Sequence, residues 1–139
     1  MHDKLIIARV LLIIMQMLVF GNQLVKKDSL PLKLIPSLKK EFLSIEFIEL
    51  DGIENLEKYG RRLFILDTVE GIKKPCIIHI ADIQKQKVLS MHDCDLGFNL
   101  LLLKKIGKID DAVIVGIPMR ISKKAACEKV SRIIAGLKA

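Results

Sequence analysis

The sequence of 139 residues contains no tryptophan and one tyrosine, and aromatic residues make up only 4% of it. Apolar residues nevertheless account for 51%, a fraction that argues against a disordered chain and predicts a packed core of mostly aliphatic side chains. No linker, low-complexity segment or internal repeat divides the chain. We therefore expect a single domain over residues 1–139, because one core serves chains of this length.

Long basic runs are also missing, although lysine and arginine outnumber aspartate and glutamate by 23 to 16 and give a net charge of +7. The lysines occur in scattered pairs with few aromatic residues among them. Proteins that bind nucleic acids typically have clustered basic surfaces, and those that bind single strands also have aromatic side chains on which the bases stack. We expect no nucleic-acid partner, and a solvated basic surface that can face an acidic one.

No apolar run is long enough to cross a membrane. The longest, Leu5–Phe20, is interrupted by Arg9 and Gln16, whereas a membrane-spanning helix needs about 20 apolar residues. No small-residue cleavage site follows it, as a signal peptide would require. We expect no membrane association and a first strand that ends at Phe20. Residues 1–14 are either an extension of the domain or lie ahead of the true start.

Cysteine is scarce. Cys76, Cys94 and Cys127 are odd in number, far apart and form no CxxC pair, which argues against a disulfide framework and a structural zinc site. We expect reduced, partly buried thiols in a cytoplasmic protein. A nucleophilic Cys94 beside His92 is a weaker alternative, because side chains two residues apart at a helix start diverge.

Strand-like and helix-like segments alternate along the chain, which predicts an α/β fold. We expect a single three-layer α-β-α domain with a twisted, mostly parallel sheet of about five strands. The predicted strands cover residues 11–20 or 17–20, 45–50, 63–66, 76–80 and 112–117. The predicted helices begin near residues 29, 53, 90 and 122, and residues 81–87 are expected to form a polar loop.

Polar residues follow two of these strands. Gly21 and Asn22 come after the first strand, with Asp28 six positions beyond Asn22, and Asp67 follows the 63–66 strand. His92 lies near the start of a predicted helix. Functional residues of open α/β sheets gather outside the carboxyl ends of the strands. Two carboxylates and an imidazole there would bind a divalent transition metal and leave coordination positions open.

Each of these residues also has a structural interpretation. Asp28 can cap a helix, Asp67 can cap the loop after its strand, and a lone histidine is usually structural. Nucleotide binding is disfavoured, because the glycines after Gly21 are Gly52 and Gly60, too distant for a phosphate-binding loop. Ligand chemistry alone does not choose among zinc, nickel and manganese.

Several motifs point to a known family. They are Gly21–Asp28 (Gly-Asn-x-Leu followed by Asp28), Asp51-Gly52 after the second strand, residues 65–71 around Asp67, residues 90–97 around His92, and residues 113–118. In this order the sequence resembles the hydrogenase maturation endopeptidases, which trim the carboxyl terminus of the large subunit of nickel-iron hydrogenases. The resemblance spans roughly Met17 to Ala139.

The resemblance implies that Asp28, Asp67 and His92 contact nickel and carry the catalysis, and that Gly21, Asn22, Asp51 and Gly52 shape the surrounding loops. It implies that the partner is a nickel-iron hydrogenase large-subunit precursor, which supplies its own nickel and is cut only after nickel insertion. The sequence departs from the family pattern at Val19, Lys27 and Ser29, where glycine, an acid and glycine are usual. An inactive relative that binds nickel or the large subunit as an assembly factor is the alternative.

Overall fold

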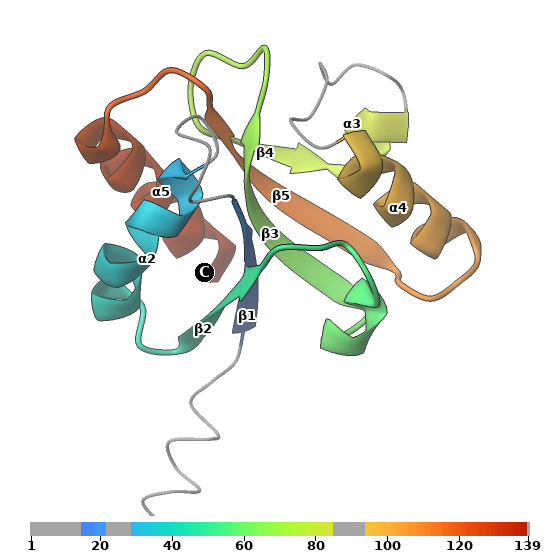
Figure 1. Cartoon of the computed structure of the whole chain (residues 1–139). Helices are drawn as coiled ribbons and strands as arrows, with labels where there is room; N and C mark the ends of the chain where they lie inside the picture. The colour runs from blue at the N-terminus through green and yellow to red at the C-terminus, as the bar shows by residue number, and fades with distance from the viewer. Residues whose placement is uncertain (1–14, 22–28, 85–93, 139) are drawn as a thin grey trace, which may run out of the picture.

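The computed structural model describes residues 15–21, 29–84 and 94–138. A five-stranded sheet in the order β2-β1-β3-β5-β4 lies between two layers of helices (Figure 1). This is the expected three-layer α-β-α arrangement. The described elements are β1 (Met15–Phe20), α2 (Leu30–Glu41), β2 (Ile45–Leu50), the 3-10 helix η2 (Leu56–Tyr59), β3 (Arg62–Val69), β4 (Cys76–His79), α3 (Ile80–Gln84), α4 (Cys94–Lys105), β5 (Asp111–Pro118) and α5 (Lys123–Lys138).

Four of the strands run in the same direction. β1 pairs in parallel with β2 and β3, and β3 pairs in parallel with β5. β4 runs antiparallel to β5 at the end of the sheet. The mostly parallel sheet is therefore confirmed. We call the edge at which β1, β2, β3 and β5 end the carboxyl edge.

The sheet is buried on both faces, which explains why its strands are nearly continuous apolar runs. Helices α2 and α5 cover one face, the α2/α5 side, where Leu34, Leu38 and Val130 pack against Met17 and Val19. Helices α3 and α4 and the 3-10 helix η2 cover the other face, the α4 side (Figure 1). The fully buried residues there include Leu56, Ile65, Leu96, Leu100 and Ile114.

Helix α2 begins one residue after Ser29, as its leucine spacing predicts, with Pro31 in the first turn. A proline suits that position because the first amides of a helix have no intrahelical partner. Pro36 lies inside the helix with its ring exposed, and the helix continues past it to Glu41. The burial of Leu34 and Leu38, both at 0% exposure, holds this segment to the sheet.

Two sequence predictions for the segment from β3 to α4 are wrong, one on the end of a strand and one on a loop. The strand predicted over 63–66 extends to Val69, because the β-branched Thr68 and Val69 continue the ladder with β5. Part of the expected loop 81–87 is helical, since Ile80 and Ile83 pack into the α4-side core and begin α3. The Asp82 carboxylate supports this turn by accepting a hydrogen bond from the His79 amide at 3.0 Å.

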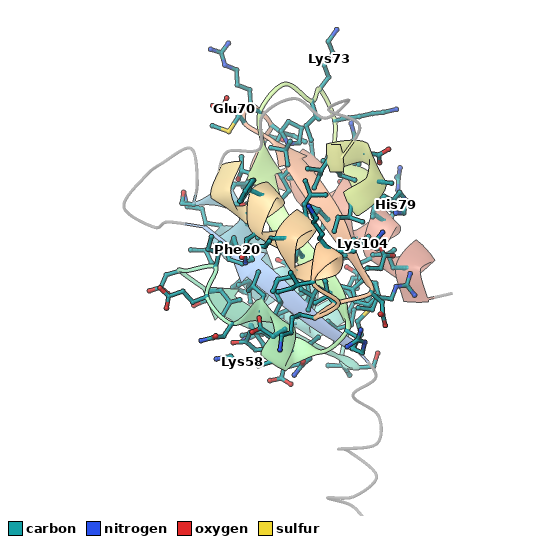
Figure 2. The ribbon with its side chains drawn as sticks, turned by 90° about the vertical axis from the view of Figure 1, so that its right-hand side faces the viewer. Phe20, Lys58, Glu70, Lys73, His79 and Lys104 are labelled. Atoms are coloured by element: carbon teal, nitrogen blue, oxygen red, sulfur yellow. The ribbon has the colours of Figure 1, made fainter. Side chains whose placement is uncertain are left out.

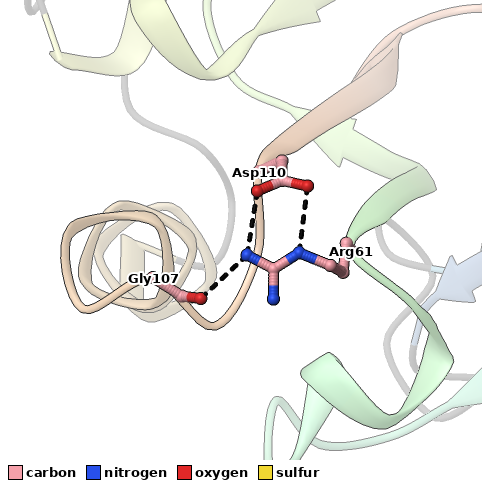
Figure 3. Close-up of polar contacts among 3 residues, drawn as sticks. All are labelled: Arg61, Gly107 and Asp110. Atoms are coloured by element: carbon pink, nitrogen blue, oxygen red, sulfur yellow. Dashed lines mark hydrogen bonds and ion pairs between the residues drawn. The ribbon is translucent and has the colours of Figure 1, made fainter.

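Helix α4 ends at Lys105, and Gly107 beyond it has a positive φ of 78°. Ile106 lies just past the end of the helix and is 57% exposed. The connection to β5 is fixed by Arg61, whose guanidinium donates to both oxygens of Asp110 at 2.9 and 3.0 Å and to the Gly107 carbonyl at 2.9 Å (Figure 3).

Helix α5 starts where the Ser122 hydroxyl accepts a hydrogen bond from the Ala125 amide at 3.1 Å, as the sequence predicts. Ala126, Val130 and Ile134 form its buried face. Within residues 15–21, 29–84 and 94–138, no helix combines the length and apolar character that crossing a membrane requires.

Candidate functional site at the carboxyl edge

Asp67 lies at the carboxyl edge, within β3 and two residues before its end, whereas the sequence predicted it directly after the strand. It is the sixth residue of β3 and is only 5% exposed. Val19 of β1 pairs with Leu66, so Phe20, the last residue of β1, is level with Asp67. Ile65 and Val69, two residues either side of Asp67 in β3, face the α4 side, as does Phe20 (Figure 2). Because alternate residues of a strand share a face, the Asp67 side chain lies on that side too.

One oxygen of the Asp67 carboxylate is held by the backbone amide of the next residue. The Thr68 amide donates a hydrogen bond to Asp67 Oδ1 at 2.8 Å. Burial of a carboxylate is unfavourable unless such donors or a cation compensate it. A hydrogen-bonded carboxylate oxygen is also the arrangement that orients metal-ligating carboxylates. Asp67 therefore fits the role of an oxygen ligand to a transition metal.

The two other predicted ligands, Asp28 and His92, lie outside the described residues, as does Asn22. The nearest described residues in the chain are Ser29, which directly precedes α2, and Cys94, which starts α4. Among the residues that the structure describes, no three histidine, cysteine, aspartate or glutamate side chains are grouped closely enough to hold an ion. The three-ligand site stays a prediction.

The predicted loop-shaping residues that the structure describes, Gly21, Asp51 and Gly52, occupy the same edge. Gly21 directly follows β1 and is half-buried, and Asp51 and Gly52 follow β2 and are exposed. In the sheet order, β1 separates β2 from β3, so Asp51 is on the far side of β1 from Asp67. Position 52 has open space around its Cα and no positive φ, so the structure does not itself require glycine there.

A groove that the sequence did not reveal opens at the carboxyl edge on the α2/α5 side. It has a volume of about 420 Å³ and lies between the start of α2 and the segment that joins β5 to α5. We call it the basic groove, because three cations and no acidic residue are among its described lining residues. Its lining residues are Ser29, Leu30, Lys33, Met119, Arg120, Ile121 and Lys123.

A second cavity, of about 290 Å³, lies at the opposite edge of the sheet. Residues at the starts of β1 and β3 line it together with Tyr59. It contains no carboxylate, imidazole or thiol, so it offers neither a general base nor a metal ligand. We do not assign a function to it.

The side chains of two cysteines are described. Cys76 and Cys127 are half-buried and form no disulfide. Burial raises the pKa of the Cys76 thiol, and the positive charge of Lys74 opposes that rise. A raised pKa leaves little thiolate at neutral pH, so Cys76 is a poor nucleophile. The side chain of Cys94 lies outside the described residues.

Comparison with known proteins gives the fold alone. No protein-family model matches the chain, and no curated protein matches it significantly. A crystal structure of an uncharacterized protein from Wolinella succinogenes is similar, with a TM-score of 0.57 and 12% sequence identity. The similarity covers 88% of this chain and 97% of that one. At this identity the likeness supports the α/β architecture and carries no information on activity.

Proposed function

We propose that the protein is an endopeptidase that removes the carboxyl-terminal peptide of a nickel-iron hydrogenase large-subunit precursor after nickel insertion. The observation that carries the proposal is Asp67. The family resemblance assigns a metal-contacting acid to this residue, and its carboxylate is buried and oriented at the carboxyl edge of a mostly parallel sheet. Functional residues concentrate at this edge in such folds.

Asp67 acts in this proposal by binding the nickel that the precursor carries, together with Asp28 and His92. Bound nickel supplies a Lewis acid beside the peptide bond to be cut. The Thr68 amide keeps one Asp67 oxygen fixed, so the carboxylate keeps a single orientation when the precursor docks. Because the metal comes with the precursor, the proposal limits the cut to precursors whose nickel is already in place.

Intact-mass analysis tests the proposal directly. A large-subunit precursor, with and without nickel, is incubated with the purified protein and its mass is followed over time. We expect loss of the carboxyl-terminal peptide only from the nickel-loaded precursor. Cleavage of nickel-free precursor that persists in a chelator would contradict nickel dependence.

The same experiment distinguishes the endopeptidase from the alternative, an inactive assembly factor. The departures at Val19, Lys27 and Ser29 are the observations in favour of that alternative. A stable complex with the nickel-loaded precursor, seen by size-exclusion chromatography, without any loss of the peptide would establish a binding role in place of proteolysis.

A further inference from the structure

We propose that the basic groove binds the carboxylates of an acidic peptide. If the proposed function holds, that peptide is the tail removed from the precursor. The groove brings Lys33 of α2 together with Arg120 and Lys123, which follow β5 near the other end of the chain. The fold therefore gathers cations that the sequence shows only as scattered charges.

None of the groove cations pairs with an acidic side chain among residues 15–21, 29–84 and 94–138. Lys33, Arg120 and Lys123 are all exposed. The ion pair found within the described part of the chain is between Arg61 and Asp110, away from the groove. Uncompensated like charges around one cavity raise the local potential and attract anions.

One further feature makes this side of the edge favourable for carboxylates. Helices α2 and α5 both begin at the groove, and neither has an acidic residue in its first turn. The positive amino-terminal ends of both helix dipoles therefore lie beside the groove.

The remaining lining favours a peptide over a nucleic acid. Leu30, Met119 and Ile121 give the groove an apolar surface beside its charges, and no aromatic residue is present on which a base could stack. The volume of about 420 Å³ falls within the range of about 300–1,000 Å³ typical of small binding sites. The groove and Asp67 lie at the same carboxyl edge but on opposite faces of the sheet.

Fluorescence anisotropy with defined peptides tests the inference. The probe is a fluorescein-labelled octapeptide with three glutamates and a free carboxyl terminus. The comparison peptide replaces glutamate with glutamine and ends in an amide. We expect the acidic peptide to bind at least about tenfold more tightly than the neutral one at low salt, and the difference to shrink at high salt.

Charge reversal with a matched control locates the binding. The variant Lys33→Glu/Lys123→Glu should lose at least about tenfold in affinity. The control Lys39→Glu/Lys129→Glu changes the net charge equally on exposed faces of the same helices, outside the groove, and should stay within about twofold of the parent. Equal binding of both peptides, or equal losses in both variants, would overturn the inference. So would a thymidine octanucleotide that displaces the acidic peptide and binds the groove more tightly.

The outcomes separate this inference from the proposed function. If the groove variant loses the peptide but no precursor is ever cut, the groove assignment stands and the endopeptidase does not. If the groove variant binds the peptide normally and cuts the precursor at the parental rate, the groove assignment fails and the endopeptidase stands.

Discussion

Asp67 of β3 pairs with Gly116 of β5, and methyl groups fill the space that a side chain on Gly116 would need. A Cβ there would lie 3.0 Å from Val69 Cγ2, 3.1 Å from Ile78 Cδ1 and 3.2 Å from Ile72 Cδ1. The strand next to the candidate acid is therefore packed without spare volume. This close packing fixes the position of β5 relative to Asp67.

Adding a methyl group at this position should destabilise the protein. Gly116→Ala forces three neighbouring side chains to shift, and overpacking of this kind costs about 1–3 kcal/mol. Urea unfolding followed by circular dichroism would show a lower midpoint with an unchanged slope.

Gly136→Ala is the matched control for Gly116→Ala. Gly136 lies in α5 and is exposed, and a Cβ there meets nothing within 4 Å. Alanine should stabilise the helix by up to about 1 kcal/mol. The two identical substitutions are thus expected to have opposite signs, and a neutral Gly116→Ala would show that the packing around this position relaxes freely.

Replacement of the candidate acid should abolish processing without unfolding the protein. In Asp67→Asn the side-chain oxygen can still accept the Thr68 amide hydrogen bond, while the negative charge is lost. If Asp67 ligates the precursor's nickel, cleavage measured by intact mass should slow at least about 100-fold.

The exposed Glu128 of α5 provides the control for this experiment. Glu128→Gln removes the same charge away from the carboxyl edge and should cut at the parental rate. A melting temperature of Asp67→Asn close to that of the parent would show that the fold is intact. Cleavage by Asp67→Asn as fast as by the parent would remove Asp67 from the mechanism.

The Arg61–Asp110 pair predicts a specific dependence of stability on pH. Hydrogen bonding from Arg61 holds the pKa of Asp110 below its ordinary value of 3.8. The pair therefore stabilises the fold above about pH 4, and this contribution is lost as the pH falls through the lower pKa of the folded state. Both side chains are exposed, so the effect should be small and should decrease with salt.

Comparison of urea midpoints tests this dependence. The midpoint of Asp110→Asn should lie below that of the parent at about pH 7, and the difference should shrink as the pH falls from about 4 through the lowered pKa of Asp110 in the folded state. A difference that stays constant across this range would mean that the pair contributes through something other than its charge.

Cys76 should react slowly with thiol reagents. Burial raises its pKa above the ordinary value of 9.0, with Lys74 opposing the rise. In a Cys94→Ser/Cys127→Ser variant, reaction with a disulfide reagent at about pH 8 should be slower in the native state than in urea. Lys74→Gln should slow it further, since less of the thiol is then ionised. Equal rates in the native and unfolded states would contradict the burial argument.

The sequence predicted those elements in which local pattern and packing agree. The strand over residues 45–50 was predicted with its observed bounds, because it ends at the Asp51-Gly52 turn. Helix α2 follows the spacing of Leu34 and Leu38, which are both buried against the sheet. The position of Asp67 at the carboxyl edge was also predicted, although β3 continues two residues beyond it.

The features that the sequence did not predict depend on tertiary contacts. β4 is short, and its antiparallel direction is set by pairing with β5 rather than by its own residues. The basic groove joins Lys33 to Arg120 and Lys123 across the chain, and a charge pattern along the sequence gives no signal of such a meeting. The convergence of Asp28 and His92 on Asp67 stays a prediction.

The reversed direction of β4 makes the chain turn back at the carboxyl edge, in residues 70–75, instead of crossing over a face of the sheet. Glu70 and Lys73 project from this turn, beyond the end of the sheet (Figure 2), and Gly71 takes a positive φ of 85° within it. The entropy of closing a loop rises only slowly with its length. Residues can therefore be added between the exposed Lys73 and Lys74 with little effect on strand pairing. The length of this turn can vary independently of the sheet, as long as Ile72 keeps its packing against Gly116.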